Sequence, residues 1–112
     1  MANFKEAWSI TSVNEGGYAN VDGDTGGETY RGITRKNFPH WKGWPIVDLH
    51  KPLHHGAIIN DQNLEGMVEQ FYIDNFWKPV HGDTMTDQDL ANQVFDMAVN
   101  AGVGEALKLL KS

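Results

Sequence analysis

The pattern of apolar residues at the start of the chain predicts an amphipathic helix. Asn3 is a residue type that caps helices, and Glu6 follows it at the spacing of a capping box. Small and apolar side chains then recur every three or four residues, which is the period of a half-buried helix. This stripe consists of Phe4, Ala7, Trp8 and Thr11. Gly16 is expected to end the helix, which places Glu15 at its C-terminus.

Two longer stripes predict two further helices. The first is capped near Asp61 and ends before Pro79, and its stripe is Leu64, Met67, Val68, Phe71, Tyr72 and Phe76. The second begins at Thr86 and ends at Gly102, and its stripe is Leu90, Val94, Phe95, Met97, Ala98 and Ala101. A last helix is predicted from Glu105 to Lys111, and its three leucines are expected to need packing partners.

The segment Glu15–Thr34 has a different pattern. It holds six of the 12 glycines (positions 16, 17, 23, 26, 27 and 32), which disfavours helix and favours a tight β-hairpin-like excursion. Thr34 is expected to cap a short helix that ends before Pro39, and residues 39–60 to form irregular loop or short turns. The predicted fold class is therefore mainly α (α+β), a helical domain with a small glycine-rich β-hairpin-like region after the first helix.

Composition and charge restrict the class of protein further. A chain of 112 residues with 40 % hydrophobic and 21 % charged residues is expected to form one globular domain, residues 1–112. The absence of cysteine excludes disulfides, thiol nucleophiles and zinc sites built on thiolate. The formal net charge of −6 has the wrong sign for a protein that tracks nucleic-acid phosphates.

Targeting signals are not recognisable in the sequence. The first residues carry Lys5 and Glu6 and lead into no apolar core of a secretory signal. The apolar runs are far shorter than the ~20 residues of a membrane-spanning helix. We therefore expect synthesis in the cytoplasm without a signal peptide, and no insertion into a membrane.

Two carboxylates in contrasting settings indicate acid–base chemistry. The partial negative charge at a helix C-terminus disfavours ionisation of Glu15 and so raises its pKa, as a general acid requires. Asp24, nine residues later in a polar loop, should stay ionised, and such a pair is typical of glycoside hydrolysis. Asp22 is an alternative second acid. The residues by themselves also leave open that all three are ordinary solvated acids in turns.

Three motifs follow one another in this segment: Glu15-Gly16-Gly17-Tyr18, Asp24-Thr25-Gly26-Gly27-Glu28-Thr29 and Arg31-Gly32-Ile33-Thr34. Together they resemble the signature of glycoside hydrolase family 108, the lysozyme-like N-acetylmuramidases also described as secretion activators. Further blocks at Phe76–Val80 and Phe95–Gly102 resemble the family too, so that the similarity extends in order over residues 15–110.

The resemblance implies a lysozyme-like fold and a peptidoglycan hydrolase that cleaves the β-1,4 bond between N-acetylmuramic acid and N-acetylglucosamine. Glu15 matches the family's catalytic acid. Asp24 matches the aspartate that phage-type lysozymes carry nine residues after their glutamate, with Asp22 as the alternative second acid. Phage-type lysozymes carry a threonine six residues past that aspartate, where this chain has Tyr30 with Thr29 adjacent. The alternative is a catalytically weak or inactive peptidoglycan-binding module with the same fold.

The resemblance also implies a biological setting. It suggests an endolysin of a bacteriophage or prophage, or a wall-remodelling enzyme, that acts on the cell wall or periplasm after release by a holin or a secretion partner. The peptidoglycan glycan strand is the expected partner, the expected state is a monomer, and neither a cofactor nor a metal is expected. The C-terminal peptidoglycan-binding region usual in the family is expected to be missing.

The remaining candidate residues have two interpretations each. The predicted substrate-binding residues are Tyr18, Thr29, Tyr30, Thr34 and Asn100. For Tyr18 and Tyr30, packing in the core or loop is an equal alternative. Asn100 shares a helix face with Asp96, and the alternative is a buried polar pair that ties the glycine loop to the core. Trp77 is expected in the core.

We further expect that valine at Gly17 or Gly26 damages the loop more than glutamine at Glu28 does. His40, His50, His54 and His55 lack the spacing of a metal site.

Overall fold

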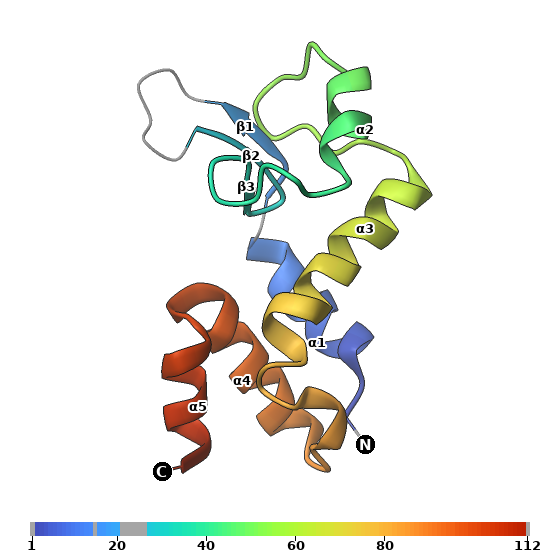
Figure 1. Ribbon diagram of the computed structural model, residues 1–112. Coiled ribbons are helices and arrows are strands. Elements are labelled where there is room, and N and C mark those ends of the chain that lie inside the picture. The colour runs from blue at the N-terminus through green and yellow to red at the C-terminus, as the bar shows by residue number, and fades with distance from the viewer. Residues whose placement is uncertain (1, 15, 21–26, 112) are drawn as a thin grey trace. The chain divides into compact units, whose positions relative to one another are not determined.

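The computed structural model describes residues 2–14, 16–20 and 27–111 (Figure 1). In chain order the elements are α1 (Phe4–Thr11), the 3₁₀ turn η1 (Ser12–Asn14), β1 (Tyr18–Asn20), β2 (Glu28–Tyr30), β3 (Ile33–Thr34), α2 (Trp44–Leu49), α3 (Gln62–Tyr72), the π-helix η2 (Ile73–Trp77), the 3₁₀ turn η3 (Gly82–Thr84), α4 (Gln88–Ala101) and α5 (Val103–Lys111). The predicted α+β class is confirmed. None of the helices described is long and apolar enough to cross a membrane.

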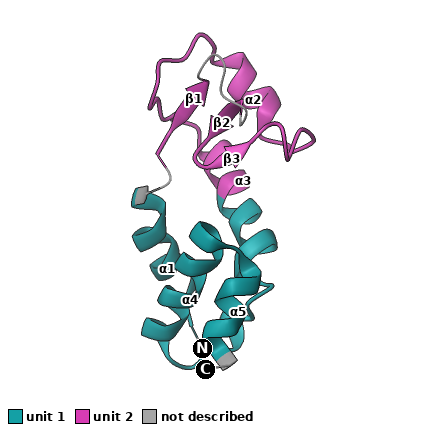
Figure 2. Ribbon diagram, turned by 90° about the vertical axis from the view of Figure 1, so that its left-hand side faces the viewer, with its two compact units in different colours: residues 1–13, 69–112 teal, residues 14–68 magenta. Residues whose placement is uncertain are grey.

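The chain divides into two compact units, shown in two colours in Figure 2. Unit 1 comprises residues 1–13 and 69–112, and unit 2 comprises residues 14–68. Unit 1 holds α1, α4, α5 and the end of α3 with the π-helix. Unit 2 holds the three strands, α2 and the first part of α3.

The core of unit 1 is built by the predicted helical stripes. Phe4 from α1 packs edge-on against Trp77 and Phe95, with ring centroids 5.6 and 5.5 Å apart. A second cluster joins α4 to α5 around the buried residues Val80, Val94, Ala98 and Ala106. Leu107 and Leu109 are packed against this cluster, so that α4 covers much of the apolar face of α5.

The N-terminus of α1 differs from the expected capping box. Asn3 caps the helix as predicted, because its side-chain oxygen accepts a hydrogen bond from the amide of Lys5 at 2.8 Å. The reciprocal bond does not come from Glu6: the amide of Asn3 donates to Oε1 of Gln88, at 2.6 Å. The α-helix also ends at Thr11 and continues as η1, rather than reaching Gly16.

Two other helices begin one or two residues away from the predicted positions. Asp61 caps α3 as predicted, with its carboxylate accepting from the amides of Asn63 and Leu64. Asp87, not Thr86, caps α4, because it is the carboxylate of Asp87 that accepts from the helix backbone. The last helix starts at Val103, directly after Gly102, where φ is +101°.

Unit 2 is organised by a small antiparallel sheet with the strand order β1-β2-β3. The glycine-rich segment therefore contains the predicted hairpin. The register places Tyr18 opposite Tyr30 and Thr29 opposite Thr34. The other edge of β1 is bonded to a later loop, since the amide of Tyr18 donates to Ala57 and the amide of Gly56 donates to Tyr18.

Two predictions for residues 34–60 were wrong. Thr34 lies in β3 and is followed by turns, so it caps no helix. The segment expected to be irregular contains α2, whose first turn holds Pro45, a position where proline costs no hydrogen bond. Trp44 is buried at the start of α2 and its indole nitrogen donates to the carbonyl of Phe38 at 2.8 Å.

Candidate functional site

The acids expected to carry the chemistry, Glu15 and Asp24, lie outside the described residues, as does the alternative Asp22. The residues that flank them on the carboxyl side, from Gly16 and from Gly27 onward, are described. These neighbours in the sequence belong to unit 2.

Gly17 is held closely between two segments. A Cβ atom at this position would stand 2.4 Å from the carbonyl oxygen of Ala57 and 2.5 Å from that of Gly56, so any side chain would clash with backbone. Its own carbonyl accepts a hydrogen bond from the amide of Arg31 at 3.1 Å. The second glycine of the motif is thus required for a close approach of two backbones.

The strand register divides the predicted substrate-binding residues between two faces of the sheet. Side chains alternate along a strand and pair across strands, which puts Tyr18 and Tyr30 on one face and Thr29 and Thr34 on the other. Tyr30 is completely buried, and its hydroxyl accepts from the amide of Ile59. Of the two roles open to Tyr30, packing is therefore the one that fits the structure.

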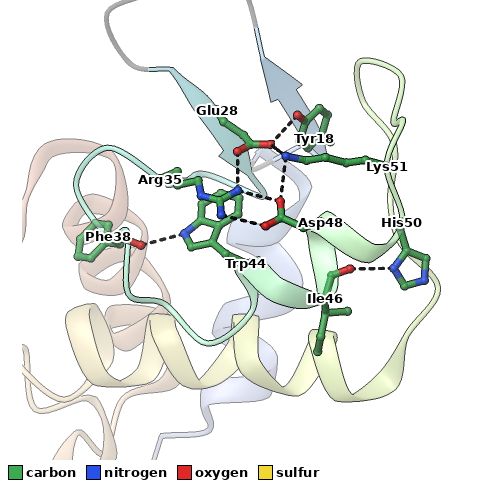
Figure 3. A network of polar contacts seen from close by, with 9 residues as sticks. All are labelled: Tyr18, Glu28, Arg35, Phe38, Trp44, Ile46, Asp48, His50 and Lys51. Atoms are coloured by element: carbon green, nitrogen blue, oxygen red, sulfur yellow. Dashed lines mark hydrogen bonds and ion pairs between the residues drawn. The ribbon is translucent and has the colours of Figure 1, made fainter.

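Tyr18 belongs to a polar network on its face of the sheet (Figure 3). Its hydroxyl donates to Oε2 of Glu28 at 2.6 Å, and the ammonium of Lys51 pairs with the same carboxylate. Arg35 donates to the other oxygen of Glu28 at 2.9 Å and forms a bidentate pair with Asp48 at 2.8 and 2.9 Å. Two acids and two bases balance, which leaves the network without net charge.

The network shifts the ionisation of its members. Burial acts to raise the pKa of Glu28, but hydrogen bonds from Lys51, Tyr18 and Arg35 outweigh it and the pKa lies below its ordinary value. Hydrogen bonds from Arg35 and Lys51 hold the pKa of Asp48 well below its usual range. Burial, followed by the hydrogen bond to Glu28, raises the pKa of Tyr18. At neutral pH both acids are ionised and the phenol is neutral.

An open hollow of about 510 Å³ adjoins this network. Its lining consists of Tyr18, Asn20, Lys51, Pro52, Leu53 and His55. The hollow combines apolar surface from proline and leucine with amide, imidazole and ammonium groups, and the charge of Lys51 is balanced by its partners. Such a surface suits neutral polar ligands better than anions.

The other predicted substrate-binding residues, Thr29, Thr34 and Asn100, differ in exposure. Thr29 and Thr34 are half-buried, and Oγ1 of Thr34 is buried and finds no hydrogen-bond partner among the described residues. Asn100 is exposed in unit 1 and its side-chain amide donates to the backbone carbonyl of Asp96. The carboxylate of Asp96 accepts from the buried hydroxyl of Thr11 at 3.0 Å. Asp96 therefore ties α4 to α1.

Among the aromatic and histidine candidates, Trp77 and His50 each have an identified partner. Trp77 is buried as expected, with its indole nitrogen donating to Asp83 at 2.7 Å. The ring nitrogen Nδ1 of His50 lies 2.9 Å from the carbonyl oxygen of Ile46, the carbonyl four residues earlier. Among the described residues no three acidic or histidine side chains gather in a way that could hold a metal ion.

Sequence reasoning did not find the residues of the polar network. Glu28, Arg35, Asp48 and Lys51 were given no role, and Glu28 was treated as more replaceable than the glycines. One signal was available: Glu28 precedes Tyr30 by two positions, and in a strand two such side chains share a face, which the structure shows to be buried at Tyr30. A carboxylate on such a face needs partners. Their identity depends on α2, which the sequence analysis missed.

Comparison with known proteins gives the relationship of the chain. The sequence profile of the family described as "Glycosyl hydrolase 108" matches residues 8–102. The solved structure of Brucella abortus SagA resembles this fold with a TM-score of 0.59 and 24 % sequence identity, and covers 96 % of this chain. The chain spans 56 % of that structure's length. No curated protein matches. The family profile covers most of the sequence, and the chain therefore belongs to glycosyl hydrolase family 108 and carries a glycoside hydrolase domain.

Proposed function

We propose that the protein is a peptidoglycan hydrolase, an N-acetylmuramidase that cleaves the β-1,4 bond between N-acetylmuramic acid and N-acetylglucosamine. The observation that carries this proposal is the family match over residues 8–102. That range includes both the Glu15-Gly16-Gly17-Tyr18 motif and the loop that contains Asp24. Membership of a glycoside hydrolase family indicates the reaction class, and the motif indicates Glu15 as the acid.

In this proposal Glu15 is the general acid that protonates the glycosidic oxygen as the bond breaks. Asp24 stays ionised and either directs the attacking water or stabilises the oxocarbenium-like charge on the sugar. Asp22 is the alternative for this second role. Reaction at a glycosidic bond by this route requires two carboxyl groups and no cofactor.

The described part of unit 2 supports a sugar-binding role for the same loop. The hollow next to Tyr18 presents an apolar wall together with amide and imidazole groups and the charge-paired ammonium of Lys51. Saccharides are recognised by this combination, because their rings have apolar faces and a rim of hydroxyl groups.

The proposal is tested by the clearing of purified bacterial cell walls and the release of reducing ends. We expect the wild-type protein to clear the walls and Glu15→Gln to lose activity by about 10²-fold or more, since the glutamine cannot donate the proton. Glu6→Gln is a matched control, because Glu6 is an exposed acid in the first turn of α1. Equal activity of wild type and Glu15→Gln would overturn the assignment of the acid.

The competing function is a peptidoglycan-binding module without turnover. The presence of Tyr30 where phage-type lysozymes have a threonine is the feature that favours it. A wild-type protein that sediments with insoluble peptidoglycan but releases no reducing ends would support this alternative. For the enzyme, we propose the cell wall or periplasm as the place of action, with a holin or secretion partner providing release.

A further inference from the structure

Arg31 occupies a turn position that its residue type does not favour. Residues 31 and 32 join β2 to β3 in a two-residue hairpin, because Tyr30 and Ile33 are register partners. Both turn residues have positive φ, +48° for Arg31 and +84° for Gly32. Such turns favour asparagine, aspartate or glycine at the first position, since a larger side chain is strained in the left-handed region.

The side chain of Arg31 offers a reason for an arginine here. It is only 13 % exposed, and its guanidinium Nη1 donates to Oε2 of Glu65 at 2.5 Å. Glu65 lies in the first turn of α3, and its own amide donates to the carbonyl of Asp61, the residue that caps the helix. The guanidinium is therefore fixed to a helix end that is itself well anchored.

The backbone of Arg31, by contrast, is bonded to Gly17 of the Glu15-Gly16-Gly17-Tyr18 motif. Its amide donates to the carbonyl of Gly17 at 3.1 Å, one step beyond the β1–β2 ladder. The next amide along, that of Tyr18, donates to Ala57 at 2.9 Å. Arg31 thus links α3, through its side chain, to the backbone two residues after position 15.

We propose that Arg31 is a positioning residue for the reaction: its ion pair with Glu65 holds the 31–32 turn, and through it the carbonyl of Gly17, so that Gly17 and Tyr18, which follow the proposed acid in the sequence, keep the conformation that catalysis needs. This proposal rests on the proposed function for its kinetic consequences, but its structural part is independent of activity. The role is distinct from substrate contact, because the guanidinium is buried against α3.

The informative variant is Arg31→Gly. Glycine adopts positive φ without strain, so this substitution retains a favourable turn while it removes the ion pair. We expect the melting temperature to remain close to that of the wild type, kcat on soluble glycan strands to fall roughly tenfold or more, and KM to change little. Glu65→Gln should give the same fall in kcat together with a lower melting temperature, because it leaves the nearly buried guanidinium of Arg31 without its charged partner. Arg31→Lys should recover part of kcat. Lys78→Gln, which removes an exposed ion pair with Asp74, is the control.

A second measurement separates this proposal from the proposed function. Amide hydrogen exchange of Tyr18 and Arg31, followed by NMR, should become faster in Arg31→Gly and Glu65→Gln but not in Lys78→Gln. If the wild type proves inactive while these amides respond as expected, only the proposed function fails. Unchanged exchange, a wild-type kcat in Arg31→Gly, or a kcat loss that disappears once rates are measured well below the melting temperature would each overturn the positioning role.

Discussion

At the scale of single residues, Glu28 joins parts of unit 2 that are far apart in the sequence. Its two carboxylate oxygens bind Tyr18 of β1, Arg35 after β3 and Lys51 after α2. Only 11 % of its side chain is exposed. A carboxylate buried to this extent stabilises the fold only while it remains ionised and paired.

This pairing predicts a pH-dependent contribution to stability. Because the pKa of Glu28 is lower in the folded protein than its ordinary value, its stabilisation is complete above about pH 5 and is lost as the pH falls through the folded-state pKa. We expect Glu28→Gln to lower the free energy of unfolding by about 1.5–3 kcal/mol at pH 7. Urea unfolding at several pH values should show this difference shrinking toward pH 3.

The control for this prediction is Asp74→Asn, which removes an ion pair whose two side chains are more than half exposed. It should have a small effect at every pH. A difference between wild type and Glu28→Gln that is as large at pH 3 as at pH 7 would show that the pairing of the ionised carboxylate is not what stabilises this region.

At the scale of elements, the sequence predicted the helices whose apolar stripes are long. It failed where the deciding contact comes from elsewhere in the chain. The amide of Asn3 is satisfied by Gln88, which is 85 positions away and was not assigned to any cap. The helix α2 has six residues, too few for a helical period to be recognised. The polar network was missed for the same reason, because it requires α2 to be in place.

The candidate site was predictable only in part. The family motifs predicted Glu15 as the acid, a prediction that lies outside the described residues, and the glycine pattern predicted the hairpin. The face of the sheet on which each side chain lies depends on register, which the glycine count does not determine. Consequently Tyr30 was assigned to the substrate as readily as to the core, and the structure shows it completely buried.

The close approach at Gly17 predicts opposite outcomes for two glycine-to-alanine substitutions. Gly17→Ala would place a methyl group 2.4 Å from a backbone oxygen and should cost about 1–3 kcal/mol of unfolding free energy. Gly66→Ala, in α3 with nothing within 4 Å of the added methyl, should gain up to about 1 kcal/mol. Urea denaturation followed by circular dichroism measures both. A Gly17→Ala variant as stable as the wild type would contradict the tight contact with residues 56 and 57.

At the scale of the whole molecule, two compact units share one chain that matches a glycoside hydrolase family over residues 8–102. The match includes elements of both units, from Trp8 of α1 to Gly102 after α4. The formal net charge of −6 gives no attraction to an anionic cell envelope. Recognition of peptidoglycan, in our account, therefore depends on contacts with the sugar and not on long-range electrostatic attraction.

We propose that this protein cleaves the β-1,4 bond that follows N-acetylmuramic acid, so that each cut leaves N-acetylmuramic acid as the new reducing end. The most direct test of this claim is to digest purified peptidoglycan with the wild-type protein, reduce the products with borohydride and identify the new reducing ends by mass spectrometry. We predict reduced N-acetylmuramic acid, formed by the wild type and absent with Glu15→Gln. Reduced N-acetylglucosamine as the new end, or no new end from the wild-type protein, would contradict the account.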